Sequence, residues 1–321
     1  RTTTRQGVKL RELSSRQKMM RGRGFVRTWR EDEKGNLFRV AKQLVNRNRD
    51  VVGTNCMKDS AGKIVMEEDK LMEVWRAHYD VLSNEEFTWD REGLTDARPV
   101  CGPSERISTL EVDAAIGKMK QGKSGGPTGV VSEMLKAAGE TGALWMTDVC
   151  NAVVKDGKIP EDWSRSWMVN VYKGKGDALA CGSYRGIKLL EHAMKVLERV
   201  IETRVRKIVK IDSMQFGFMA GRSTTDAIFI VRQLQEKYLA KNKELWMAFV
   251  DLEKAFDRVP REVVWWALRY LGVDEWIVSV IRAMYEDATT KVRLNGRESN
   301  AFSVRVGVHQ GSVLSPLLFP H

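Results

Sequence analysis

Two aspartates that follow a short apolar run are the residues best suited to metal chemistry. The run Leu245–Val250 is uninterrupted, as in a strand buried on both faces, and Asp251 stands at its end with Asp257 six residues on. Mg²⁺ takes carboxylate oxygens together with substrate phosphates and water. The pattern therefore indicates a Mg²⁺ ligand that polarises a phosphate and activates a hydroxyl, with a helix-capping loop as the alternative.

A second group of residues has the chemistry to hold phosphate. Lys173, Lys175 and Arg185 lie among glycines in residues 155–210, which carry 13 lysines and arginines against 7 acidic residues. Arginine offers a planar fork to phosphate, and lysine offers a point charge. Taken alone, a solvated basic loop is the simpler interpretation.

A third pattern matches the sequence motif of a nucleotide-binding P-loop but not the structural context that a P-loop needs. Residues 117–124 fit G-x-x-x-x-G-K-S. A P-loop follows a strand and opens a helix, whereas Ser108 and Glu111 predict a capped helix in front and Gly125-Gly126-Pro127 comes directly after. A helix that ends in a flexible loop is therefore favoured over an ATPase.

Charge is distributed unevenly along the chain. The net charge is +11, and residues 1–50 alone hold 15 lysines and arginines against 5 acidic residues, while residues 51–110 hold 7 against 12. A block this basic points to a polyanion, either nucleic acid or an acidic membrane surface. The 43% hydrophobic content excludes disorder throughout.

Other functional classes lack their sequence signatures. No apolar run approaches the roughly 18 residues that span a bilayer, and the first residues do not form an apolar signal stretch. The four cysteines and four histidines are too scattered for a zinc site or a disulfide framework. We expect a protein of a reducing compartment, inside the cell and not secreted.

These residues must be positioned by a mixture of helices and strands, which predicts an α+β chain. Amphipathic spacing, caps and breakers predict helices, and apolar alternation predicts strands. The helices are expected at residues 67–82, 108–122, 131–138, 143–154, 191–209, 223–241, 260–271 and 274–286, and the strands at 167–172, 245–250 and in a hairpin about Asn295-Gly296. A soft boundary is expected in the loop at 83–106.

Five blocks, in order, resemble the reverse transcriptases of non-LTR (LINE-type) retrotransposons, over residues 107–319. The blocks are GKSGGPTG at 122–129, residues 159–190, QFGFMAGRSTTD at 215–226, FVDLEKAFD at 249–257 and GVHQGSVLSPLLF at 307–319. The resemblance implies the fingers and an incomplete palm of a right-hand polymerase at residues 107–321. Residues 1–106 would form an N-terminal helical extension, basic in residues 1–50.

The resemblance implies RNA-directed DNA synthesis by two-Mg²⁺ nucleotidyl transfer, with Mn²⁺ as a substitute metal. Asp251 and the Leu252 carbonyl would hold Mg²⁺, and Phe256 would be the aromatic gate that excludes a ribose 2′-hydroxyl. The partners implied are an RNA template, a DNA primer and deoxynucleoside triphosphates, with no membrane. The expected location is the cytoplasm and nucleus.

The remaining site residues also follow from the resemblance. Arg185 and one of Lys173 or Lys175 would hold the triphosphate. Gln310 and Gly311 would lie under the nucleotide and template. The template backbone would be contacted by Arg222, and the basic block at 1–50 would act as a template-RNA clamp.

Three departures bear on activity. Thr128 stands where the family usually has Asp, and Ala220 stands where Pro or a basic residue is common. The family's aromatic-x-Asp-Asp hairpin is expected tens of residues after Phe319, beyond the printed sequence. We therefore expect a fragment or an interrupted copy that binds nucleic acid with little or no synthesis; the alternative is a non-catalytic RNA-binding or chaperone remnant.

Overall fold

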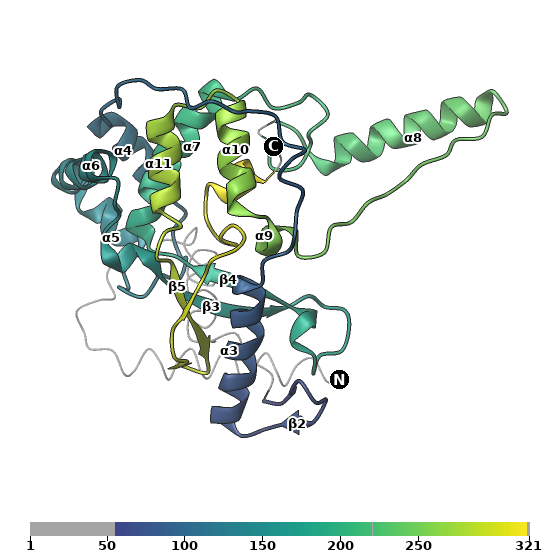
Figure 1. Cartoon of the computed structure of the whole chain (residues 1–321), viewed down its shortest axis with the longest axis horizontal. Helices are drawn as coiled ribbons and strands as arrows, with labels where there is room; N and C mark the ends of the chain where they lie inside the picture. Colours follow the sequence, from purple (N-terminus) through teal and green to yellow (C-terminus); the bar gives the residue numbers. More distant parts are fainter. Residues whose placement is uncertain (1–54, 220, 320–321) are drawn as a thin grey trace, which may run out of the picture. The chain divides into compact units, whose positions relative to one another are not determined.

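A small mixed sheet lies among several helices (Figure 1). The computed structural model describes residues 55–219 and 221–319. Within them the chain is α+β, as the sequence predicts. The basic block at 1–50 lies outside the described residues, and the division at residue 106 stays a prediction.

The helices agree with the predicted ranges to within a few residues at most ends. They are α3 (Glu68–Asn84), α4 (Thr109–Gly117), α5 (Ser132–Ala137), α6 (Gly139–Asp156), α7 (His192–Ile208), α8 (Thr224–Ala240), α9 (Ala255–Arg258), α10 (Arg261–Tyr270), α11 (Glu275–Ala283) and α12 (Ser315–Leu318), with 3₁₀ turns η2 (Glu161–Ser164) and η3 (Cys181–Ser183). The predicted signals for helix starts and ends are present. Ser108 and Glu111 form a capping box at α4, and Gly272, just after α10, has a φ of 79°.

The larger sheet has five strands in the order β4-β3-β5-β6, with β7 also paired to β5. The strands are β3 (Arg165–Tyr172), β4 (Tyr184–Leu189), β5 (Thr289–Leu294), β6 (Arg297–Glu298) and β7 (Phe302–Ser303), and a separate pair is formed by β1 (Met57–Lys58) and β2 (Ile64–Val65). β3 runs antiparallel to β4 and parallel to β5. The predicted hairpin about Asn295-Gly296 is confirmed for β5 and β6, and both turn residues have positive φ.

The buried apolar residues form two clusters. In one, α3 packs Trp75 and Tyr79 against Met168 of β3 and Tyr184 of β4. Gly186 of β4 makes this approach possible, because a Cβ there would lie 2.6 Å from both the Tyr79 ring and the Met168 Sδ. The larger cluster joins α4, α6, α7, α10, α11 and α12.

The predicted strand at 245–250 is wrong. These residues form no ladder with any strand of the described part, and Trp246, Phe249 and Val250 are each more than 80% exposed. They follow α8, which has no buried residue and extends away from the other helices in Figure 1. Apolar composition gives a segment β-propensity, but only pairing with a neighbouring backbone makes it a strand.

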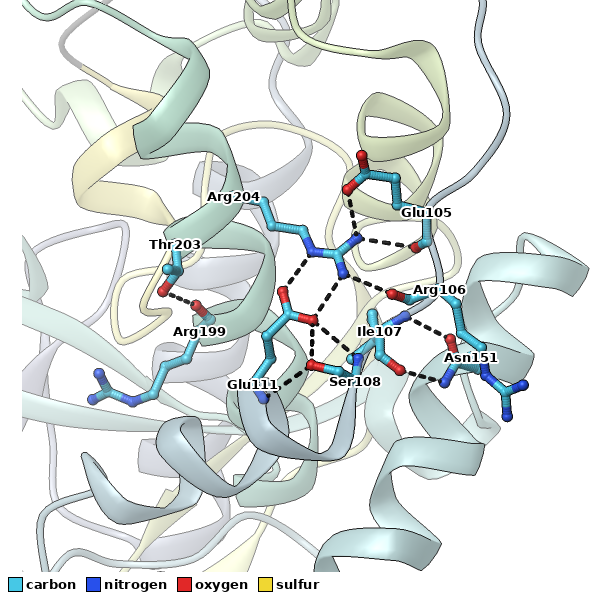
Figure 2. A network of polar contacts seen from close by, with 9 residues as sticks. All are labelled: Glu105, Arg106, Ile107, Ser108, Glu111, Asn151, Arg199, Thr203 and Arg204. Atoms are coloured by element: carbon cyan, nitrogen blue, oxygen red, sulfur yellow. Dashed lines mark hydrogen bonds and ion pairs between the residues drawn. The ribbon is translucent and has the colours of Figure 1, made fainter.

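A buried guanidinium ties the segment before α4 to α7 (Figure 2). Arg204 Nε donates to Glu111 Oε1 at 2.8 Å, and its Nη atoms donate to the carbonyls of Glu105 and Arg106 at 3.0 and 2.9 Å. The same Glu111 side chain closes the capping box with Ser108. One carboxylate therefore caps α4 and pairs with Arg204.

No helix within residues 55–219 and 221–319 is long and apolar enough to cross a bilayer.

Replacing Arg204 tests this network. Arg204→Ala leaves two backbone carbonyls and Glu111 without their donor, so we expect the free energy of unfolding to fall by about 3 kcal/mol. Urea denaturation measures it. The matched control is Arg165→Ala, which removes an exposed pairing with Glu161 and Asp162 and should cost less than about 1 kcal/mol. Equal losses in the two variants would contradict a special role for Arg204.

Acid should weaken the same network. The Arg204 hydrogen bond and those of Ser108 lower the pKa of Glu111 to about 2 from its ordinary 4.5. A folded pKa below the unfolded one stabilises the fold above pH 4.5 and loses that stabilisation as the pH falls towards 2. Between pH 4.5 and about 2, the free energy of unfolding should depend on pH more steeply in the wild type than in Glu111→Gln. The control is Asp113→Asn, at an exposed position of α4, which should show the same pH dependence as the wild type.

Candidate active site

One cleft gathers most of the predicted site residues. It has a volume of about 810 Å³ and lies where the β3–β4 hairpin, the segment at 251–257 and the loop at 309–312 meet. The predicted residues that line it are Lys173, Lys175, Arg185, Asp251, Leu252, Phe256, Gln310 and Gly311. Residues from three distant parts of the sequence are therefore brought to one surface.

The basic side of the cleft is the end of the β3–β4 hairpin. Tyr172 pairs with Tyr184, which places Lys173 and Arg185 on facing strands at the same end. The Lys173 side chain donates to the Gly182 carbonyl at 2.8 Å. Arg185 and Lys175 are exposed, so their charges face solvent in the cleft.

Asp251 lies in irregular backbone just before α9. Its side chain is exposed, and it forms no ion pair with any residue of the described ranges. Within those ranges, no group of three or more acidic, histidine or cysteine side chains is arranged to hold a metal ion. Three acidic residues line the cleft, namely Asp251, Glu253 and Asp257, and Leu252 follows Asp251 directly.

Phe256 is held by two other aromatic rings. It stacks on Phe319 with ring centroids 4.6 Å apart and meets Phe218 edge-on at 6.4 Å. Offset stacks and edge contacts are the preferred aromatic geometries. The position of the Phe256 ring in the cleft is thus fixed by packing.

Gln310 and Gly311 are held against β4. The Lys188 backbone N–H donates to the Gln310 carbonyl at 2.7 Å, and a Cβ on Gly311 would lie 2.4 Å from the Lys188 carbonyl oxygen. Gly311 also has a φ of 120°, so the position requires glycine. The Gln310 amide nitrogen donates to Asp257 Oδ2 at 2.8 Å.

Buried charges behind this loop were not identified from the sequence. Glu198 of α7 is buried and accepts from Ser312 Oγ at 2.7 Å and from the Val313 N–H at 2.8 Å. Burial raises the pKa of Glu198, while these two hydrogen bonds act to lower it. Glu198 thus fixes the backbone that follows Gly311.

Lys188 is the second buried charge. It stands at the inward position of β4, two residues beyond Gly186, and burial lowers its pKa to about 7 with a smaller contribution from Arg261. Asp257 acts in the opposite direction. A lysine at an inward strand position is a signal that sequence reading could have used.

Arg222 lies apart from the cleft. It is exposed near the start of α8, donates to the Ser213 carbonyl, and has its guanidinium 5.7 Å from the centre of the Phe216 ring. It does not line the cleft. The predicted template contact therefore remains a prediction.

The glycine-rich segment at 122–129 does not have P-loop geometry. The helix α4 precedes it, and the Gly122 N–H donates to Glu133 Oε1 at 2.6 Å. A P-loop gives such N–H groups to phosphate. The preference for a helix running into a loop is confirmed.

Thr128, the departure from the family's Asp, has a clear partner. Its N–H donates to Glu191 Oε1 at 2.8 Å, and its hydroxyl donates to Glu191 Oε2. Glu191 is 1% exposed. The contact therefore already contains one buried carboxylate, and a second one at position 128 would lie directly against it.

Comparison with known proteins agrees with the motifs. Residues 172–320 match the family of reverse transcriptases (RNA-dependent DNA polymerases). This segment is therefore similar to a reverse transcriptase domain, and the relatives that it resembles include RNA-directed DNA polymerases.

The resemblance to non-LTR retrotransposon enzymes is also confirmed. The chain is 27% identical over 248 residues to a probable RNA-directed DNA polymerase from transposon BS of Drosophila melanogaster, covering 75% of this chain and 27% of that protein. It is 28% identical over 263 residues to the probable polymerase from transposon X-element of the same organism, covering 77% and 28%. The chain thus spans little more than a quarter of these relatives.

A carboxylate placed at position 128, with and without removal of the one at position 191, tests the contact between Thr128 and Glu191. Thr128→Asp places a carboxylate against buried Glu191, so we expect a loss of about 2 kcal/mol or more in the free energy of unfolding. Adding Glu191→Gln gives the new carboxylate an amide donor and should restore most of that loss. Urea denaturation of both single variants and the double variant measures the coupling; losses that simply add would contradict this account.

Proposed function

We propose that this chain supplies the nucleotide-binding part, the fingers and the start of the palm, of an RNA-directed DNA polymerase. The observation that carries the proposal is the single cleft lined by residues from four motif blocks, at 159–190, 215–226, 249–257 and 307–319. The family match over residues 172–320 supports the same reaction class. The substrates would be an RNA template, a DNA primer and deoxynucleoside triphosphates, handled in the cytoplasm and nucleus.

The donor atoms in the cleft fit a Mg²⁺ ion that arrives with its nucleotide. Mg²⁺ is commonly bound through one or two carboxylates and substrate phosphates while it keeps several waters. Asp251 and the Leu252 carbonyl would hold it. When bound, such an ion neutralises phosphate charge and lowers the pKa of a primer hydroxyl. Of the acidic residues that line the cleft, the resemblance assigns metal binding to Asp251 alone, so we expect little synthesis by this chain alone.

The other residues bind and orient the substrates. Arg185 and Lys173 or Lys175 would pair with the triphosphate and offset the charge that develops during in-line transfer. Phe256, fixed by its aromatic neighbours, would exclude a ribose 2′-hydroxyl by bulk. Gln310 and Gly311 would form the floor under the nucleotide, and Arg222 would contact the template backbone.

Nucleotide binding tests this function directly. The chain is mixed with Mg²⁺, an RNA template annealed to a dideoxy-terminated DNA primer, and the complementary deoxynucleoside triphosphate, and nucleotide affinity is measured without chemistry. Asp251→Ala and Arg185→Ala should each weaken binding by about tenfold, since each removes a charged contact.

The control is Asp148→Asn, at an exposed position of α6, which should bind as the wild type does. Binding of the duplex without any binding of the nucleotide would refute the proposal and favour the RNA-chaperone alternative. Primer extension on an unblocked primer completes the test. Robust extension that is lost in Asp251→Ala would contradict the expectation of little synthesis.

A further inference from the structure

Asp257 joins the segment that carries Phe256 to the loop that carries Gln310. The Val308 N–H donates to the Phe256 carbonyl at 2.7 Å. Gly307 passes so close that a Cβ there would lie 2.5 Å from the Asp257 carbonyl oxygen. The backbone of Asp257 is therefore fixed against the loop, and its side chain projects from a rigid support.

The Asp257 carboxylate accepts a hydrogen bond from Gln310 Nε2 at 2.8 Å. A glutamine amide has a donor end and an acceptor end, and its partners decide which way it points. Because a carboxylate only accepts, Asp257 selects the nitrogen end. The oxygen of the Gln310 amide therefore makes no hydrogen bond with Asp257.

The charges around Asp257 favour this arrangement. Burial raises the pKa of Asp257, and the nearby lysines, led by Lys188, act to lower it. Lys188 is also the residue whose N–H holds the Gln310 carbonyl. One strand position thus supports both the backbone of Gln310 and the ionised form of its side-chain partner.

We propose that Asp257 is a positioning residue for the nucleotide site, which fixes the Gln310 amide so that its oxygen faces the incoming nucleotide. The inference rests on the proposed function and deepens it. Asp257 acts through Gln310, and what it must supply is an acceptor. Asparagine at 257 retains one acceptor oxygen, whereas leucine retains the bulk and none of the polarity.

The experiment measures deoxynucleotide affinity in the complex of this chain, Mg²⁺ and the RNA template with blocked primer. Asp257→Leu and Gln310→Met should each weaken nucleotide binding by about tenfold. The double variant should be no weaker than either single one, because both remove the same contact. Asp257→Asn should stay within about threefold of the wild type, and affinity for the RNA–DNA duplex should not change. Asp148→Asn serves again as the control.

Three outcomes would overturn the inference. Losses that multiply in the double variant would mean that the two residues act independently. An Asp257→Asn variant as weak as Asp257→Leu would mean that charge, not an acceptor, is required. Full nucleotide affinity in Gln310→Met would show that the Gln310 amide does not contribute to nucleotide binding. This variant still tests the inference if Asp257→Leu does not fold.

Failure of the proposed function gives a different experimental result from failure of this inference. A wild-type chain that binds no nucleotide refutes that function and the nucleotide role of Asp257 with it. Urea denaturation of the wild type, the two single variants and the double variant still reports the coupling between positions 257 and 310, so a correct contact with a wrong function is distinguished from a wrong contact.

Discussion

The cleft depends on one partly buried guanidinium that holds three separate backbone carbonyls. Arg261, at the start of α10, donates to the carbonyl oxygens of Gly307, Tyr285 and Val304 at 3.1, 2.9 and 2.8 Å, and it lies over the Tyr285 ring. Burial lowers its pKa to about 10, so it stays charged at neutral pH. Because irregular backbone near a core needs partners for its carbonyls, this side chain supplies donors to Val304 and Gly307, where the chain leaves β7 and enters the loop at 307–312.

The remaining supports of that loop are also polar and come from distant elements. Glu198 of α7 holds its far end, β4 holds its middle through Lys188, and Gly307 and Gly311 allow the close approach. Apolar packing alone cannot fix a loop with this accuracy, since hydrophobic burial has no direction. A few directed hydrogen bonds, each made inside the protein, position the floor of the cleft.

Local signals predicted most of the helices, and motif order predicted the cleft. Ser108 with Glu111 marked the start of α4 because a capping box depends only on residues three apart. The strand at 245–250 was wrong because pairing is not a local property. The contacts of Asp257 and Glu198 were not predicted for the same reason, because their partners lie 53 and 114 residues away in the chain.

The exposed segment after α8 has a consequence for how the protein behaves in solution. Trp246, Phe249 and Val250 are bulky, prone to form strands and open to solvent, without a proline among them. Short stretches of this kind recruit other chains by edge-to-edge pairing. This segment therefore favours association between chains, and a partner or detergent that covers it should raise the solubility of the protein.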